Sequence, residues 1–207
     1  MYIPRYYSVL DRDEIIRFLH EFSFGILITS ENNVPVATHI PFLIFEKENQ
    51  KLFLQGHMAS ANPHVDQLKR LPEALSIFSS SHHYISSSWY SHPNVSTWNY
   101  RAVHVYGSIR IISKEELLSQ VTDMQHLHEK NNVHPVEVEN LPPKLIDGYL
   151  KQITGFEIEV NDVQAKYKLS QNRNEKDYES VIEHLRQLNN PDAEAVAGEM
   201  EKIKKKQ

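Results

Sequence analysis

Aromatic and histidine side chains gather in one stretch of the 207-residue chain, residues 79–107. These side chains are Trp89, Trp98, Tyr84, Tyr90, Tyr100, Tyr106, His82, His83, His92 and His104. The stretch has one formal charge, on Arg101, whereas a solvated loop of this length normally carries several. Rings interleaved with hydroxyl and imidazole groups are typical of a pocket wall that binds a flat, largely apolar ligand. A β-hairpin with cross-strand aromatic pairs uses the same residue types, and the stretch taken alone favours that structural interpretation.

The segment from Gly56 to Pro63 has features of a phosphate site. It reads Gly-His-Met-Ala-Ser-Ala-Asn-Pro and joins a predicted strand to a helix predicted over residues 64–71. Asn62 is a good N-cap, and the small residues 59–61 let a ligand approach the backbone. Unpaired N–H donors at a helix start attract anions. An ordinary capped junction has the same features, so both interpretations stay open.

A third segment, Lys168-Leu-Ser-Gln-Asn-Arg173, is rich in hydrogen-bond donors. Lys168 and Arg173 could meet an anion, and the amides of Gln171 and Asn172 could bind the edge of a heterocycle. A polar loop that leads into the next helix explains the segment equally well.

Metal and nucleophile chemistry find little support in the sequence. The chain has no cysteine, which excludes a thiolate nucleophile, a disulfide and any Cys-ligated metal site. Its 12 histidines form no His-Glu-x-x-His motif, and no Gly-x-Ser-x-Gly elbow occurs. A metal site would need distant residues such as His39, His57 and His104, and we expect none.

The elements that must position these residues are mostly short strands. Segments rich in branched and aromatic residues alternate with turn signals such as Glu31-Asn-Asn33. They predict strands over residues 24–29, 35–45, 51–56, 74–79, 98–112, 154–160 and 165–169. Both registers of the 98–112 strand carry apolar groups, so we expect both of its faces to be covered.

Capping residues mark the helix starts. Asp11 with Glu14 and Ser113 with Glu116 read as capping boxes, and Asn174 reads as a third N-cap. Shorter helices are predicted over residues 144–153 and 192–203. Short strands with helices inserted and appended predict an α+β fold built on an antiparallel barrel or sandwich.

Composition indicates a globular chain without strong charge. The formal net charge is −5, the sequence pI is about 6.2, and 40% of the residues are hydrophobic. This balance argues against a protein that binds nucleic acid through its overall charge. The start of the chain has no signal-peptide core, and apolar runs such as 40–45 are too short to span a bilayer. We therefore expect a cytoplasmic protein that does not enter a membrane.

Four ordered motifs resemble the PaiB family, whose members are described as FMN-binding negative transcriptional regulators. The motifs are Gly56-His-x-Ala-x-Ala-Asn-Pro63, Tyr84-Ile-Ser-x-Ser-Trp-Tyr90, Thr97-Trp-Asn-Tyr100 with Val103-His-Val-Tyr-Gly107, and Lys168-Leu-Ser-Gln-Asn-Arg173. The similarity covers essentially the whole chain. It implies an antiparallel split β-barrel with flanking helices over residues 1–170, similar to pyridoxamine-phosphate oxidase. Residues 171–207 would form a C-terminal helical extension that packs on the barrel or on a partner subunit.

The resemblance also implies a flavin site, in a homodimer with flavin at the subunit interface. Strand 38–41 would lie along the isoalloxazine ring, segment 57–62 would hold the ribityl phosphate, residues 98–100 would border the ring, and residues from 168–173 would close the site. The implied FMN-binding residues are Thr38, His39, Ile40, Pro41, Gly56, His57, Met58, Ala59, Ser60, Asn62, Trp98, Asn99, Tyr100, Lys168, Gln171 and Arg173. No catalytic residue is implied.

Two positions depart from the family pattern. The family often has a basic residue where this chain has Ser60, and proline where it has Ser87. A serine offers phosphate only a neutral hydrogen bond, so we expect weak FMN binding and a flavin-free protein as purified.

The resemblance implies a negative regulator of protease synthesis and sporulation, acting as a flavin or redox sensor with a protein partner. Direct DNA binding is not supported by charge, because residues 168–207 contain eight basic and eight acidic residues. The basic cluster Lys202, Lys204, Lys205 and Lys206 reads as a solvated tail. One alternative function is an FMN-dependent oxidoreductase or flavin reductase that uses NAD(P)H, and a third is a heme-handling split barrel.

Overall fold

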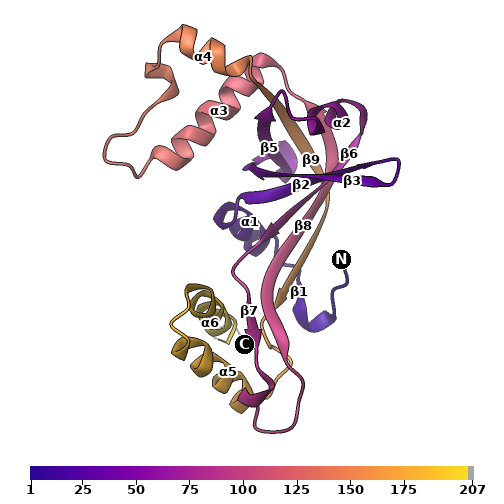
Figure 1. Ribbon diagram of the computed structural model, residues 1–207, viewed down its shortest axis with the longest axis vertical. Coiled ribbons are helices and arrows are strands. Elements are labelled where there is room, and N and C mark those ends of the chain that lie inside the picture. Colours follow the sequence, from indigo (N-terminus) through magenta and orange to yellow (C-terminus); the bar gives the residue numbers. More distant parts are fainter. Residues whose placement is uncertain (205–207) are drawn as a thin grey trace. The chain divides into compact units, whose positions relative to one another are not determined.

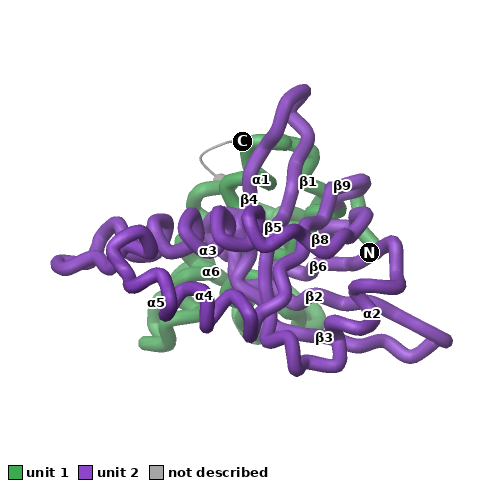
Figure 2. The backbone as a smooth tube through the Cα atoms, turned by 90° about the horizontal axis from the view of Figure 1, so that it is seen from above, with its two compact units in different colours: residues 1–18, 79–103, 164–207 green, residues 19–78, 104–163 purple. Residues whose placement is uncertain are grey.

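The computed structural model describes residues 1–204 (Figure 1), and the chain divides into two compact units (Figure 2). Unit 1 combines residues 1–18, 79–103 and those from 164 onward. Unit 2 combines residues 19–78 and 104–163. Each unit is therefore assembled from segments that are distant in the sequence. Lys205 and Lys206 of the predicted basic tail lie outside the described residues.

The secondary structure follows the predicted order. The strands are β1 (Ser8–Val9), β2 (Phe24–Glu31), β3 (Val34–Pro41), β4 (Leu43–Lys47), β5 (Lys51–Ala59), β6 (Glu73–Ser79), β7 (His83–Ile85), β8 (Thr97–Ile111) and β9 (Ile153–Lys168). The α-helices are α1 (Arg12–Glu21), α2 (His64–Arg70), α3 (Lys114–Glu129), α4 (Pro143–Leu150), α5 (Glu175–Gln187) and α6 (Pro191–Lys204). Short 3-10 helices are η1 (Arg5–Tyr7), η2 (Glu48–Gln50), η3 (Ser87–Trp89) and η4 (Val138–Asn140).

Unit 2 contains most of an antiparallel sheet that curls back on itself. Its strands pair in the order β3-β2-β6-β8-β9-β5-β4, and the β2–β3, β4–β5 and β5–β9 pairs are antiparallel. The β3 end of the sheet returns to β5, because a Cβ atom on Gly56 would lie only 2.7 Å from Cγ2 of Ile40. A sheet that curls back on itself in this way confirms the predicted split barrel.

Phe42 lies in the core of unit 2. Its ring packs edge-on against Phe78, with centroids 5.1 Å apart, and against Phe156, with centroids 6.1 Å apart. All three rings are fully buried. Burial of one such side chain stabilises the fold by about 1.5–3 kcal/mol. These phenylalanines therefore hold together strands that the chain order separates widely.

Helices α3 and α4 lie side by side in unit 2 (Figure 1). The Ser113–Glu116 capping box begins α3 as predicted, with both reciprocal hydrogen bonds present. Leu117 of α3 packs with Ile112 and Leu150 in a buried apolar cluster. This cluster anchors the two helices.

Helices α5 and α6 pack on each other in unit 1. The hydroxyl of Tyr178 donates to the Met200 carbonyl at 2.7 Å, and burial raises the pKa of Tyr178 to about 12. The one charge of the aromatic stretch, on Arg101, is buried and forms an ion pair with Glu199 at 2.8 Å. Asn174 caps α5 by accepting from an N–H group of its first turn, as predicted.

The structure corrects three predicted elements. The strand predicted over 35–45 is interrupted at Phe42, whose N–H donates to the Ser23 carbonyl instead of a ladder partner. The strands predicted over 154–160 and 165–169 are one continuous strand, β9. The helix predicted over 144–153 ends at Leu150, because Ile153 already pairs with Ala59 of β5.

The two registers of β8 differ in burial. Val103, Val105 and Ile109 are buried, whereas Ala102 and Tyr106 are half-buried. One register therefore lies in the core, whereas the other is covered only in part within the described residues.

Candidate functional site

The predicted site residues on β3 and β5 come together in unit 2. The contact between Ile40 and Gly56 joins the two strands, and both positions are buried. Ile40 and Met58 point into the core, so only their backbone groups face outward. His39 is exposed and stacks on Phe24, with ring centroids 6.1 Å apart. Pro41 ends β3 and is half-buried.

A buried histidine supports Thr38. His64 is 1% exposed, and its Nδ1 atom lies 2.7 Å from the Thr38 hydroxyl. Its Nε2 atom lies 2.8 Å from the hydroxyl of Thr29, which donates to the side-chain oxygen of Gln67 at 2.6 Å. Burial lowers the pKa of His64, which favours the neutral ring. Thr38 is therefore held in place by a chain of hydrogen bonds that ends on α2.

His57 is fixed by a residue of α3. Its Nδ1 atom lies 2.9 Å from the side-chain oxygen of Gln120, which is fully buried. Ser60 follows β5, and its hydroxyl lies 2.9 Å from that of Thr154 while its N–H donates to the Gln152 carbonyl. Both predicted phosphate-side residues are therefore tied to neighbouring elements.

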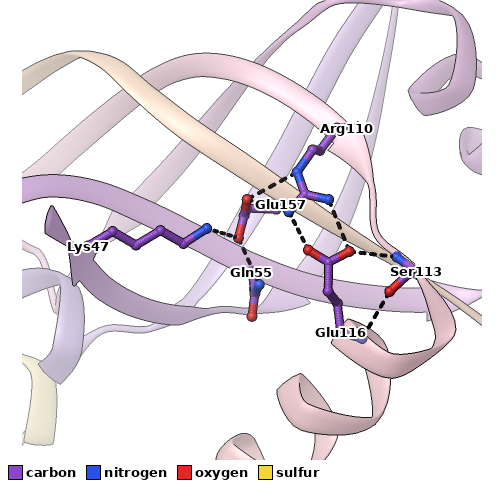
Figure 3. A network of polar contacts seen from close by, with 6 residues as sticks. All are labelled: Lys47, Gln55, Arg110, Ser113, Glu116 and Glu157. Atoms are coloured by element: carbon purple, nitrogen blue, oxygen red, sulfur yellow. Dashed lines mark hydrogen bonds and ion pairs between the residues drawn. The ribbon is translucent and has the colours of Figure 1, made fainter.

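A network of charged residues anchors the start of α3 to the barrel (Figure 3). Glu157 of β9 is 4% exposed and accepts from Lys47 at 2.9 Å, Gln55 at 2.8 Å and Arg110 at 2.8 Å. Arg110 also pairs with Glu116 in the first turn of α3. Because Gln120 lies one turn further along α3, this network helps to place it against His57.

The network shifts the pKa values of its carboxylates downward. Burial alone would raise the pKa of Glu157, but the hydrogen bonds from Lys47, Arg110 and Gln55 outweigh it. The hydrogen bond from Arg110, followed by that from the Ser113 N–H, lowers the pKa of Glu116 to about 2. Both carboxylates are therefore ionised at neutral pH.

Asn62 caps the turn before α2. Its side-chain oxygen accepts from the His64 N–H at 3.0 Å. The structure places the N-cap one residue later than predicted, at Pro63, which has helical backbone angles. Ala59 ends β5, pairing with Ile153, and is exposed. The helix that follows has only seven residues.

Residues 98–100 lie in unit 1 on β8, with Trp98 and Tyr100 on one face of the strand and Asn99 on the other. Trp98 is 51% exposed and packs edge-on against Tyr84, with centroids 6.1 Å apart. Tyr100, two residues along, is half-buried. Asn99 is fully buried. The nitrogen and the oxygen of its side-chain amide form hydrogen bonds with the Ser170 hydroxyl, at 3.0 and 3.1 Å. Only the two rings therefore face outward.

The predicted cationic segment also lies in unit 1. Lys168 donates to the Trp98 carbonyl at 3.1 Å and to the Thr97 hydroxyl. The amide of Gln171 bonds only backbone, accepting from the Leu169 N–H and donating to the Tyr167 carbonyl. It braces the turn that leads to Arg173.

Sequence reasoning missed His64, Gln120 and Glu157. Glu157 stands between Phe156 and Ile158 in an apolar strand, which is a detectable signal for a buried, paired carboxylate. Gln120 likewise follows Leu117 on the apolar stripe of its helix. Nothing local singles out His64, since its partners lie 26 and 35 residues away.

Two features are absent from the part of the chain that the structure describes. Among residues 1–204, no three histidine, aspartate or glutamate side chains gather closely enough to ligate a metal ion. No helix in the same part of the chain combines the length and apolar character needed to cross a membrane.

Comparison with known proteins identifies the family. A family described as "Putative FMN-binding domain" matches residues 1–162. The chain is also 47% identical over 207 residues to "Protease synthase and sporulation protein PAI 2" of Bacillus subtilis, covering 100% of both proteins. The chain belongs to this FMN-binding-domain family. The resemblance to PaiB proteins is thereby confirmed.

Solved structures support the fold of this FMN-binding-domain protein. A conserved hypothetical protein of Mycobacterium tuberculosis, Rv2991, gives a TM-score of 0.56 at 16% identity, covering 81% of this chain and 91% of that one. A FAD- and heme-binding protein of Mycobacterium smegmatis gives a TM-score of 0.54 at 12% identity, covering 78% of this chain and 73% of that one. At such identities the likeness shows a shared fold.

Proposed function

We propose that this chain is an FMN-binding transcriptional regulator that acts negatively on protease synthesis and sporulation. The observation that carries the proposal is the 47% identity with PAI 2 along the full length of both proteins. A missing domain or a partial match would weaken the inference of function from this relative. The alignment instead covers 100% of both proteins.

The residues of unit 2 fit a flavin phosphate and ring edge. Thr38 is half-buried, and its hydroxyl is oriented by His64, so it can meet the polar edge of a ring. The turn over residues 59–62 offers the Ser60 hydroxyl and small side chains, which permit close approach. Gly56 leaves no room for a side chain beneath it. We assign these residues to FMN.

The six remaining predicted residues, all in unit 1, divide into three pairs. Trp98 and Tyr100 present rings that can border a flat heterocycle, and Lys168 and Arg173 present positive charge. Asn99 and Gln171 use their amides within the protein, so we assign them a supporting role. A bound flavin would supply the redox chemistry that a chain without cysteine lacks.

We further propose a homodimer with flavin at the subunit interface and a weak affinity for FMN, because Ser60 replaces a basic residue. Light scattering on a sizing column tests the dimer. It should give about twice the chain mass of 24.1 kDa, and a mass of one chain would contradict it.

Gene replacement tests the regulatory role. In a Bacillus subtilis strain that lacks PAI 2, expression of this chain should restore the parental level of secreted protease. A Gly148→Ala variant, changed at a position with open space around it, should restore it equally. An unchanged protease level with the wild-type chain would contradict the proposal.

Oxidation of NAD(P)H separates a regulator from an enzyme. With FMN bound, the regulator should consume at most about one NAD(P)H per flavin. Many turnovers per flavin would favour the oxidoreductase alternative instead.

A further inference from the structure

Three cations gather in unit 1 without a carboxylate partner. Lys166 and Lys168 are two residues apart on β9, so their side chains leave the same face of the strand. Arg173 follows a turn after β9. Among the described residues, none of the three forms an ion pair, although other cations of unit 1, such as Arg101 and Arg186, do.

The turn after β9 is built to place Arg173. Ser170 has a φ of 63°, in the left-handed region that non-glycine residues seldom adopt. The Arg173 N–H donates to the Ser170 carbonyl at 3.0 Å, and the side-chain amide of Gln171 forms hydrogen bonds with the backbone of Tyr167 and Leu169. The position of Arg173 is therefore set by the backbone rather than by an acidic partner.

Two buried polar atoms beside Arg173 lack hydrogen bonds. Its guanidinium lies 4.6 Å from the ring centroid of Tyr90, which is 8% exposed. Neither the Arg173 Nε atom nor the Tyr90 hydroxyl bonds any other described residue. Leaving such groups unpaired costs about 1–3 kcal/mol each, so a native site normally supplies partners.

Nearby carboxylates are already committed. Asp177, four residues after Arg173, accepts from the Ser91 N–H at 2.7 Å and from the Asn174 amide at 2.9 Å. Glu199, another carboxylate of unit 1, pairs with Arg101 and Lys202. Neither Asp177 nor Glu199 forms an ion pair with the three cations, so these charges are open to an added anion.

The cations also act on each other and on Tyr7. Burial, with repulsion from Lys166 and Arg173, lowers the pKa of Lys168. Burial raises the pKa of Tyr7, against the opposing effect of Arg173 and Lys166, so its hydroxyl remains a donor near these charges. Like charges held together in a partly buried site favour an anion between them.

We propose that Lys166, Lys168 and Arg173, with the hydroxyls of Tyr7 and Tyr90, form a binding site for a phosphoryl oxyanion. A phosphoryl group offers several acceptor oxygens, which suits a guanidinium, two ammonium groups and two hydroxyl donors at once. The site shares Lys168 and Arg173 with the proposed flavin site, and all five of its residues belong to unit 1. The phosphoryl group can belong to FMN or to a separate small anion.

Thermal unfolding in inorganic phosphate tests the site, with sodium chloride at matched ionic strength as the reference. Phosphate should raise the melting temperature of the wild-type chain more than chloride does. The variants Lys166→Met and Arg173→Met should each lower the affinity for phosphate about ten-fold or more. Tyr90→Phe keeps the ring and removes only the hydroxyl. It should lower the affinity for phosphate less than the two methionine variants do. Lys176→Met removes the same charge from an exposed position of α5 and should leave the phosphate response unchanged.

Competition identifies the source of the phosphoryl group. If phosphate weakens FMN binding but not riboflavin binding, and Lys166→Met removes this competition, the cationic site holds the phosphate of the flavin. If phosphate weakens the binding of neither flavin, the cationic site holds a separate anion. Both results support the site. Where the wild-type chain fails to bind FMN, the rise in melting temperature with phosphate still tests the site on its own. The proposal is overturned if phosphate stabilises the wild type no more than chloride does, or stabilises both methionine variants equally well.

Discussion

At the scale of single residues, His64 couples the candidate site to the stability of the barrel. It is almost fully buried, and both ring nitrogens bond threonine hydroxyls. Its lowered pKa means that the folded protein resists the proton that the unfolded chain accepts. The free energy of unfolding should therefore depend on pH in part through this ring.

The first prediction concerns that pH dependence. Below about pH 6.5 the unfolded chain binds a proton at His64 that the folded chain does not, so stability should fall as the pH drops toward the folded-state pKa. The slope from this residue can reach about 1.4 kcal/mol per pH unit. Urea unfolding between pH 5 and 7.5 should show this slope in the wild type and a smaller one in His64→Gln. Equal slopes would contradict the assignment.

The second prediction concerns the buried carboxylate of Glu157. Glu157→Gln keeps the side-chain shape but removes the charge that Arg110 and Lys47 bind. We expect a loss of about 2 kcal/mol in the free energy of unfolding. Glu159→Gln is the matched control, because that half-exposed side chain pairs with Lys51 at the surface and should cost under about 1 kcal/mol. Similar losses in both variants would refute a special role for Glu157.

A third prediction tests the phosphate-side turn. Asn62→Leu removes the acceptor of the His64 N–H and a polar group beside the proposed phosphate position. FMN should bind about ten-fold more weakly, measured by quenching of flavin fluorescence. Asn62→Ser, which keeps a capping oxygen, should bind FMN more tightly than the leucine variant. Unchanged affinity in both variants would place the phosphate elsewhere.

Local residue roles were predicted better than long-range ones. The caps at Ser113 and Asn174 depend only on residues three positions away, so the sequence reveals them. The amides of Asn99 and Gln171 were predicted to bind the flavin. In the structure, both form hydrogen bonds with other residues of the chain. Asn99 meets Ser170 across 71 residues, a contact that no spacing rule can detect.

At the scale of elements, glycines mark where strands approach closely. A Cβ atom on Gly56 would lie 2.7 Å from Ile40 and 2.8 Å from Phe156. The contact closes the barrel and aligns β3 with the start of the predicted phosphate segment. The glycine of the Gly56-His motif is therefore required by packing in this structure, whatever it contributes to a ligand.

The fourth prediction follows from this contact. Gly56→Ala should lower the free energy of unfolding by about 1–3 kcal/mol, because the methyl group overpacks the barrel. Gly148→Ala adds the same atom to α4, where the space is open, and should raise stability by up to about 1 kcal/mol. Denaturant unfolding of the two variants measures the difference. A neutral effect at Gly56 would mean that β3 and β5 are less close than the structure shows.

Strand existence was predictable, but strand ends were not. The alternation of apolar residues located β2, β5, β6 and β8, since a half-buried strand imposes a period of two. The break at Phe42 was missed because it lies within an apolar run. Continuity of β9 was missed because Asn161 and Asp162 look like a turn, although the Asn161 amide bonds Ser108 on β8.

At the scale of the whole molecule, the division into two units was not visible in the sequence. Strands β8 and β9 each continue from one unit into the other, at residues 103–104 and 163–164. The alternation through Val103 and His104 is uninterrupted, so no local signal marks the change. The predicted boundary at residue 170 stays a prediction, as does the flavin site assembled from both units.

The central claim is that this chain binds FMN, and a titration of the purified protein with FMN tests it most directly. Absorption and fluorescence should change saturably toward one flavin per chain, with riboflavin binding more weakly because it lacks the phosphate. Flavin spectra that stay those of the free cofactor at millimolar protein would contradict the account.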